Sequence, residues 1–200
     1  MIVIMGVSGS GKTTLGKSLS DETRIPFYDA DDFHSDHNKE KMTKGLPLSD
    51  NDRILWLNTL KNKISYWSKI GETILACSAL KEDYRKKLML NNSIKWIFLE
   101  GSFKQISSRL FNRENHFFNS NLLKSQFDIL EIPSYGTHLN CNQSSDELCE
   151  LIVKKLKLNT NSSIGVIGLG VMGEGIALNI AEQKIKISVY NRTIPGEEKI

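Results

Sequence analysis

The sequence predicts an α/β fold in which a parallel sheet carries helices on both faces. Short apolar runs of strand length alternate with longer stretches of helical spacing up to about residue 158. Polar or glycine-rich turns separate these runs, and capping boxes at residues 49–52 and 144–147 mark the starts of two helices. Such alternation favours parallel pairing, because each helix returns the chain to the end of the sheet where the next strand begins.

The expected elements follow from this alternation in chain order. Strands are expected at residues 1–5, 24–29, 73–77, 94–99 and 139–141. Helices are expected at residues 13–20, within 34–45, and at 49–67, 78–90, 103–111, 122–130 and 144–156. The apolar face of the helix after residue 49 is expected to consist of Ile54, Leu55, Leu57, Leu60, Ile64 and Trp67.

A glycine-rich turn joins the first strand to the first helix. Gly6, Gly11, Lys12 and Thr13 fit the pattern G-x-x-x-x-G-K-[ST], in which backbone N–H groups surround phosphate oxygens. The lysine of this pattern reaches the β- and γ-phosphates, and the Thr hydroxyl binds Mg²⁺. The residues expected to bind ATP are Gly6, Val7, Ser8, Gly9, Ser10, Gly11, Lys12, Thr13 and Thr14. The alternative is a loop that is rich in Gly and Ser by chance, but the strand before it and the helix after it favour the phosphate loop.

An acidic cluster, Asp29, Asp31 and Asp32, follows the second expected strand. Carboxylates at the carboxyl end of a strand lie where open α/β sheets bind ligands. One could hold the shell of Mg²⁺, and another could orient an attacking hydroxyl or accept its proton. The alternative is that these side chains only cap the next turn.

Several basic residues also follow strands or begin helices. Arg53 lies in the first turn of the long helix, where a cation opposes the helix dipole, so a ligand carboxylate is one explanation and an exposed Arg without a role is the other. Lys81 comes just after the third strand. Arg109 and Arg113 lie in a basic segment between two helices, which in a P-loop kinase would be a lid over ATP and otherwise a charged helix face.

The last part of the chain begins the α/β pattern again after a polar linker at residues 159–163. A strand runs into G-x-G-x-x-G, with a helix expected at 172–183 and a strand at 186–190. A basic residue stands where an acidic one would bind a ribose hydroxyl, which favours NADP, although a glycine turn that only packs the helix is the alternative. The residues concerned are Gly168, Gly170, Gly173, Asn191, Arg192 and Thr193.

Composition restricts the classes of partner. The formal net charge of +3 is mild and the basic residues are dispersed, so we expect no nucleic acid. The three cysteines have neither zinc-site nor disulfide-framework spacing, and the N-terminal apolar run is only five residues long. We therefore expect a cytoplasmic protein that does not bind a membrane.

Residues 1–158 resemble gluconokinases of the small P-loop type. The motifs that carry this resemblance lie at residues 6–14, 29–34, 38–42, 45–53, 56–57, 78–81, 84–85, 116–117, 122–127 and 130–131. The resemblance implies an adenylate-kinase-like fold and transfer of the ATP γ-phosphate to the 6-hydroxyl of D-gluconate. Ser35 and Leu55 depart from the family, which usually has proline at both positions.

The resemblance also implies roles for individual residues. Lys12, Asp31 and Arg113 would be catalytic, Thr13 and Asp29 would bind Mg²⁺, and Arg109 and Arg113 would reach the nucleotide from the lid. The residues expected to bind the substrate are Asp31, His34, Lys41, Arg53 and Lys81. A homodimer is possible, as in other members. A shikimate- or nucleotide-type kinase and a nucleotide-binding module without catalysis are the alternatives.

Residues 164–193 are similar to the opening of 6-phosphogluconate dehydrogenase, an enzyme that would consume the kinase product. We expect an incomplete Rossmann βαβ unit at 164–200, which would bind NADP only if it were complete. This organisation suggests a truncated fusion of two consecutive enzymes. We expect the unit to be loosely ordered or docked on the kinase domain and to lack dehydrogenase activity.

Overall fold

The computed structural model describes residues 1–89, 93–111 and 120–160, with short stretches at 164–167, 175–176, 178–179 and 187–190. Contacts between residues divide the chain into two compact units, Met1–Lys157 and Leu158–Ile200, and each is described by itself. No helix in the described part of the chain is long and apolar enough to cross a membrane.

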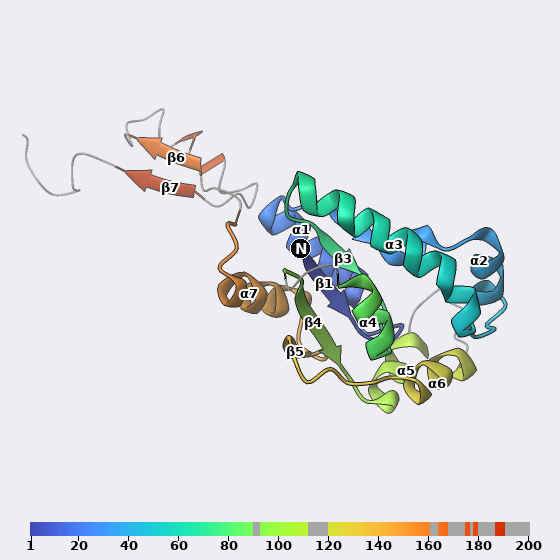
Figure 1. Ribbon diagram of the computed structural model, residues 1–200. Helices are drawn as coiled ribbons and strands as arrows, with labels where there is room; N and C mark the ends of the chain where they lie inside the picture. The colour runs from blue at the N-terminus through green and yellow to red at the C-terminus, as the bar shows by residue number, and fades with distance from the viewer. Residues whose placement is uncertain are drawn as a thin grey trace, which may run out of the picture. The chain divides into compact units, whose positions relative to one another are not determined.

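The first unit is built on a sheet of five parallel strands in the order β2-β3-β1-β4-β5 (Figure 1). These strands are β1 (Ile2–Met5), β2 (Phe27–Asp29), β3 (Ile74–Ala76), β4 (Lys95–Glu100) and β5 (Thr137–Asn140). The central strand β1 pairs with β3 on one side and with β4 on the other. All four of its residues are buried, as expected for a parallel strand that is covered on both faces. The predicted parallel α/β fold is thus confirmed.

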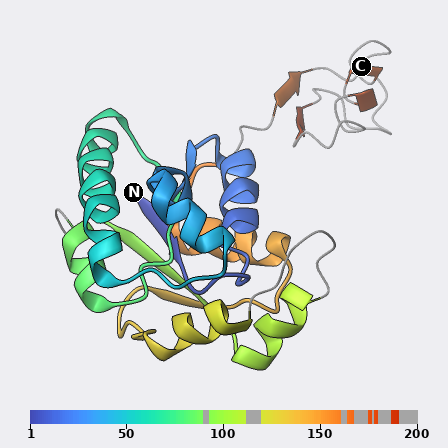
Figure 2. The same cartoon turned by 90° about the vertical axis from the view of Figure 1, so that its right-hand side faces the viewer.

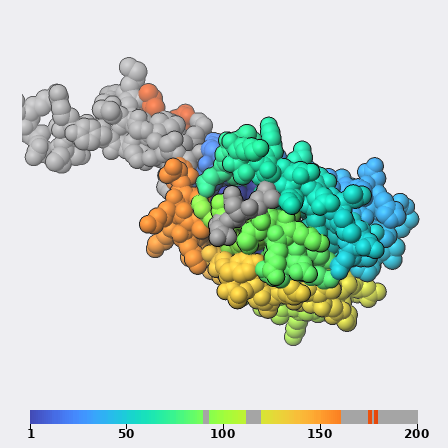
Figure 3. Space-filling view, in the orientation of Figure 1, coloured from blue at the N-terminus to red at the C-terminus, as the bar shows by residue number. Residues whose placement is uncertain are grey.

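Helices cover both faces of this sheet (Figure 2). On one face, α3 (Asp50–Ile70) packs against α4 (Glu82–Leu88), and α1 (Lys12–Thr23) packs against α7 (Ser145–Leu156) on the other. Val3 and Met5 of β1 belong to the core under α3 and α4. The space-filling view shows the side chains of α3 and α4 adjoining over this face (Figure 3). The alternation of β1 side chains between the two faces therefore supplies apolar surface to both helix layers.

Shorter elements connect these strands and helices along the chain. They are a 3₁₀ helix η1 (Ala30–Phe33) and the helices α2 (Asp36–Thr43), α5 (Phe103–Phe111) and α6 (Ser120–Asp128). The capping boxes that begin α3 and α7 are both present, with Ser49 and Asp52 in the first and Ser144 and Glu147 in the second.

The structure corrects the apolar face that the sequence predicted for α3. Ile54 and Leu55 are 47% and 74% exposed, so they do not belong to the core. The buried positions are Trp56, Leu57, Leu60, Ile64 and Trp67. Spacings of three, four and seven residues place these side chains on one side of the helix, while 54 and 55 project from the other side.

Element boundaries differ from the predicted ones by a few residues. The second strand begins at Phe27 instead of Arg24, because Arg24 adopts a left-handed conformation (φ 61°) and ends α1. Helix α4 ends at Leu88, α6 begins at Ser120, and β5 covers residues 137–140 instead of 139–141. Helix ends and edge strands depend on tertiary contacts that a local pattern does not contain.

The second unit contains a parallel pair of strands, β6 (Ile164–Ile167) and β7 (Ile187–Tyr190), with Ile164 opposite Ile187. Helical residues at 175–176 and 178–179 fall within the predicted helix. The candidate residues for NADP lie outside the described residues: Gly168, Gly170, Gly173, Asn191, Arg192 and Thr193.

Candidate active site

The phosphate loop connects β1 to α1 through glycines in left-handed conformations. Gly9 has φ 79°, and a Cβ there would lie 2.6 Å from Cγ of Leu110, so a side chain is excluded. Gly11 has φ 99° and is the N-cap of α1. Its carbonyl accepts a hydrogen bond from the Leu15 N–H. The Lys12 ammonium donates to the carbonyl of Val7 at 2.9 Å and so folds over the loop. Loss of hydration lowers the pKa of Lys12, while the charges of Asp31 and Asp29 oppose this shift.

Thr13 and Asp29 meet at the carboxyl end of the sheet. The Thr13 hydroxyl donates to Asp29 Oδ2 at 2.7 Å, and Asp29 Oδ1 accepts the backbone N–H of Asp31 at 3.1 Å. Asp29 therefore caps η1, as the alternative interpretation of the acidic cluster predicted. It also contacts Thr13 of the phosphate loop. A hydroxyl and a carboxylate oxygen are the hard ligands that suit Mg²⁺, so these two side chains fit the ion.

Asp31 and His34 lie beside this pair. His34 stacks on Trp56 with ring centroids 4.5 Å apart, and its Nε2 lies 3.9 Å from Asp31 Oδ1. Burial, with smaller contributions from Arg53 and Lys39, lowers the pKa of His34 to about 4, so its ring is neutral at pH 7. Desolvation raises the pKa of Asp31 and Lys12 lowers it. The Asp31 side chain is nevertheless 69% exposed, so its carboxylate is accessible to a ligand.

The structure brings together two cations that were expected to bind the substrate, Arg53 and Lys81. Lys81 Nζ lies 2.8 Å from Asp50 Oδ2, and Arg53 Nη1 lies 4.0 Å from Asp50 Oδ1. The Tyr84 hydroxyl also donates to Asp50, and both cations lie 5.6 Å from the centroid of the Tyr84 ring. The hydrogen bonds from Lys81 and Tyr84 lower the pKa of Asp50. We call Asp50, Arg53, Lys81 and Tyr84 the basic cluster.

A buried arginine that the sequence analysis assigned no role supports this cluster. Arg85 is 1% exposed, and its Nη1 donates to the carbonyls of Ala79 at 2.8 Å and Leu80 at 3.2 Å. Glu82 neutralises it through Oε2, 2.9 Å from Nη2. These bonds hold residues 79–80, where Ala79 has φ 41°, and thereby position Lys81.

Lys41 is paired within the protein. Its ammonium lies 2.9 Å from Asp52 Oδ1, and Asn38 of the same helix donates to the Asp52 carbonyl at 2.7 Å. These contacts join α2 to the first turn of α3. Lys41 would have to exchange its ion pair to reach a substrate.

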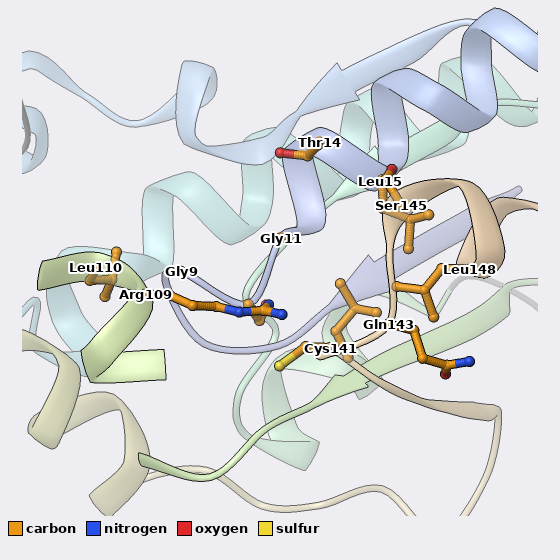
Figure 4. A pocket seen from close by; sticks show the side chains of 12 residues that line it. Gly9, Gly11, Thr14, Leu15, Arg109, Leu110, Cys141, Gln143, Ser145 and Leu148 are labelled. Atoms are coloured by element: carbon orange, nitrogen blue, oxygen red, sulfur yellow. The ribbon is translucent and has the colours of Figure 1, made fainter. Parts of the chain in front are cut away.

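A pocket of about 290 Å³ lies beside the phosphate loop (Figure 4). Arg109 reaches into it from α5, whereas Arg113 lies outside the described residues. The pocket is lined by Gly9, Ser10, Gly11, Thr14, Leu15, Leu99, Arg109, Leu110, Cys141, Gln143, Ser145 and Leu148. The sequence analysis did not find the wall at 141–148. These residues could have been found as the polar segment between β5 and α7, because open α/β sheets bind ligands at the carboxyl ends of their strands.

A phosphate loop, an oxygen-ligand pair and a basic cluster at the carboxyl ends of parallel strands define a P-loop kinase of small molecules. The family model described as shikimate kinase matches residues 8–135. "Probable gluconokinase" of Dictyostelium discoideum is 43% identical in an alignment 172 positions long, and the match covers 78% of this chain and 86% of the relative. The chain therefore belongs to the shikimate kinase family of P-loop kinases and, within it, to the gluconokinases.

Two solved structures agree with this assignment. A sugar kinase from Janibacter sp. has a TM-score of 0.72 and 38% identity, covering 78% of this chain and 94% of its own. A gluconokinase from Sinorhizobium meliloti has a TM-score of 0.70 and 29% identity, covering 89% and 95%. Residues 163–200 match the model described as the NAD binding domain of 6-phosphogluconate dehydrogenase, as the sequence resemblance predicted.

Proposed function

We propose that this chain transfers the γ-phosphoryl group of ATP to the 6-hydroxyl of D-gluconate. The observation that carries this proposal is the basic cluster, where Arg53 and Lys81 converge on one carboxylate, Asp50. Such a pair of cations can bind the carboxylate of a sugar acid through charge-assisted hydrogen bonds. The gluconokinase names of the relatives support the same acceptor.

The donor side would be formed by the phosphate loop and the adjoining pocket. The loop from Gly6 to Thr14 would hold the phosphates through the Lys12 ammonium and through backbone amides other than that of Ser8, which already has a side-chain acceptor. The pocket with Arg109 would take the nucleoside. Arg113 is proposed to stabilise charge from the lid. Thr13 and Asp29 would hold Mg²⁺, which when bound neutralises charge on the β- and γ-phosphate oxygens.

The acceptor side would be ordered by Asp31. Its exposed carboxylate would accept a hydrogen bond from the 6-hydroxyl and take the proton as the new O–P bond forms. The bond between the γ-phosphorus and the bridging oxygen breaks, and ADP leaves with that electron pair. Neutral His34 would donate from Nε2 toward the same region, and Lys12 would stabilise the charge that develops on the phosphoryl oxygens.

A substrate panel tests this function. Purified protein with ATP and Mg²⁺ should release ADP with D-gluconate. Release should be at least about 100-fold slower with shikimate, whose hydroxyls are on a ring, and with nucleosides, which have no carboxylate. Faster turnover of shikimate or a nucleoside would identify a different kinase. Tight ATP binding without transfer to any acceptor would favour a nucleotide-binding module.

Two further expectations remain part of this proposal. We propose a cytoplasmic location and a homodimer, for which cell fractionation and light scattering are the respective measurements. An incomplete C-terminal unit would leave NADP without a role in this chain.

A further inference from the structure

One side chain of α6 makes two hydrogen bonds to a single residue of the phosphate loop. The Ser8 N–H donates to Gln126 Oε1 at 2.7 Å, and Gln126 Nε2 donates to Ser8 Oγ at 3.0 Å. The two residues are 118 positions apart, so this is a tertiary contact between α6 and the loop. The roles proposed above for the active-site residues do not use it.

The helix that carries Gln126 packs against α5. Leu123 on α6 is 2% exposed, and the Phe127 ring meets the edge of Phe103 from α5 with centroids 5.5 Å apart. From α5, Leu110 lies so close to Gly9 that it leaves no space for a side chain there. The tip of the loop, Ser8 and Gly9, is therefore in contact with both α5 and α6.

These contacts affect the loop before any nucleotide binds. A backbone N–H that already has a side-chain acceptor is satisfied, and the orientation of its peptide plane is fixed. This restricts the orientations of the following peptides of the loop, so less conformational entropy is lost when phosphate binds. The Ser10 N–H, which donates to the Val7 carbonyl at 3.2 Å, closes the turn around the same peptide.

We propose that Gln126 is a positioning residue that holds the phosphate loop in its nucleotide-binding conformation by way of Ser8. The inference rests on the proposed binding of ATP by this loop but not on the identity of the acceptor. It assigns to α6 the task of keeping the donor site ordered.

The test compares Gln126→Leu with Lys124→Gln in the full chain. Leu removes both hydrogen bonds with little change of volume, whereas Lys124 is 68% exposed on the same helix and pairs with Asp128. Two quantities are measured without gluconate: the hydrogen-exchange rate of the Ser8 amide by NMR, and the Kd of a fluorescent ATP analogue. Gln126→Leu should raise both the rate and the Kd by about 10-fold. Lys124→Gln should leave both within about twofold of the values for the natural sequence.

Two more variants distinguish positioning from general damage. Gln126→Glu retains an acceptor for the Ser8 N–H and should retain the slow exchange at Ser8 even if the added charge weakens ATP binding. Ser8→Ala removes only the hydroxyl bond, so the double variant Ser8→Ala/Gln126→Leu should bind no worse than Gln126→Leu alone.

The proposal is wrong if Gln126→Leu leaves the Ser8 exchange rate and the nucleotide affinity at the level of Lys124→Gln. It is also wrong if the losses of nucleotide affinity caused by Ser8→Ala and by Gln126→Leu simply add in the double variant. Should Gln126→Leu fail to fold, fast Ser8 exchange in a folded Gln126→Glu protein would overturn it. A chain that binds the ATP analogue but does not phosphorylate gluconate would contradict the proposed function and leave this inference standing.

Discussion

Asp50 places a negative charge between the two cations that we propose for the gluconate carboxylate. Its oxygens take up hydrogen bonds from Lys81 and Tyr84 that a substrate carboxylate would otherwise receive. Asp50→Asn should therefore lower the KM for gluconate by about 3- to 10-fold with little change in kcat, because one competing charge is removed; the effect is modest because the Asp50 side chain is 64% exposed. Steady-state kinetics with gluconate as the varied substrate measures this.

Asp36→Asn is the matched control for that experiment. Asp36 is likewise an exposed acid in the first turn of a helix, α2, so its loss reproduces any effect on the helix dipole. A KM for gluconate that rises in Asp50→Asn but not in the control would show that Asp50 supports substrate binding instead of competing with it.

His34 makes stability depend on pH. Its pKa is about 4 in the folded protein against 6.5 in an unfolded chain, because the ring is buried against Trp56. Below pH 6.5 the unfolded chain binds a proton that the folded chain does not, so this contribution is complete above pH 6.5 and is lost as the pH falls toward 4. The full loss is about 3 kcal/mol.

His34→Phe provides the comparison, since it keeps an aromatic ring against Trp56 and removes the titrating group. Urea unfolding at pH 7, 5.5 and 4.5 should show the free energy of unfolding of the natural sequence falling more steeply than that of the variant. Parallel pH dependences in the two proteins would mean that His34 is not held neutral by burial.

At the scale of elements, local patterns predicted what is determined locally. The phosphate loop, the two capping boxes and the alternation of strands and helices were predicted correctly, because each depends on residues within a few positions of one another. Ile54 and Leu55 were placed in the core of α3 incorrectly, because the side of a helix that faces the sheet depends on how the helix docks.

The support of the site could not be predicted in this way. Arg85 binds the carbonyls of Ala79 and Leu80 and is neutralised by Glu82, and the side chain of Tyr135 completes its environment from 50 residues away. Gln126 reaches Ser8 over 118 positions. In sequence both look like ordinary polar residues of surface helices, and only the fold shows that Arg85 contacts residues 79–80 and that Gln126 contacts the phosphate loop.

At the scale of the whole molecule, the kinase unit ends before the second unit begins. The described residues of the candidate site all lie within Met1–Lys157, and β6 pairs with β7 inside the second unit. The division between the units coincides with the polar stretch around residues 158–163. Proposals about the two units can therefore be tested separately.

The second unit gives the last prediction. A Rossmann fold needs further parallel strands to cover both faces of its sheet, and the described strands of the second unit are β6 and β7. Truncation after Asn161 should therefore leave kcat and KM for gluconate within about twofold, because the kinase unit retains its own core and site residues. Coupled assays of ADP release on the 200-residue and truncated chains measure this, and a large loss of kcat would show that the second unit supports the kinase.

The 200-residue chain should also fail to reduce NADP⁺ with 6-phosphogluconate, and measurable reduction would show a functional dehydrogenase site.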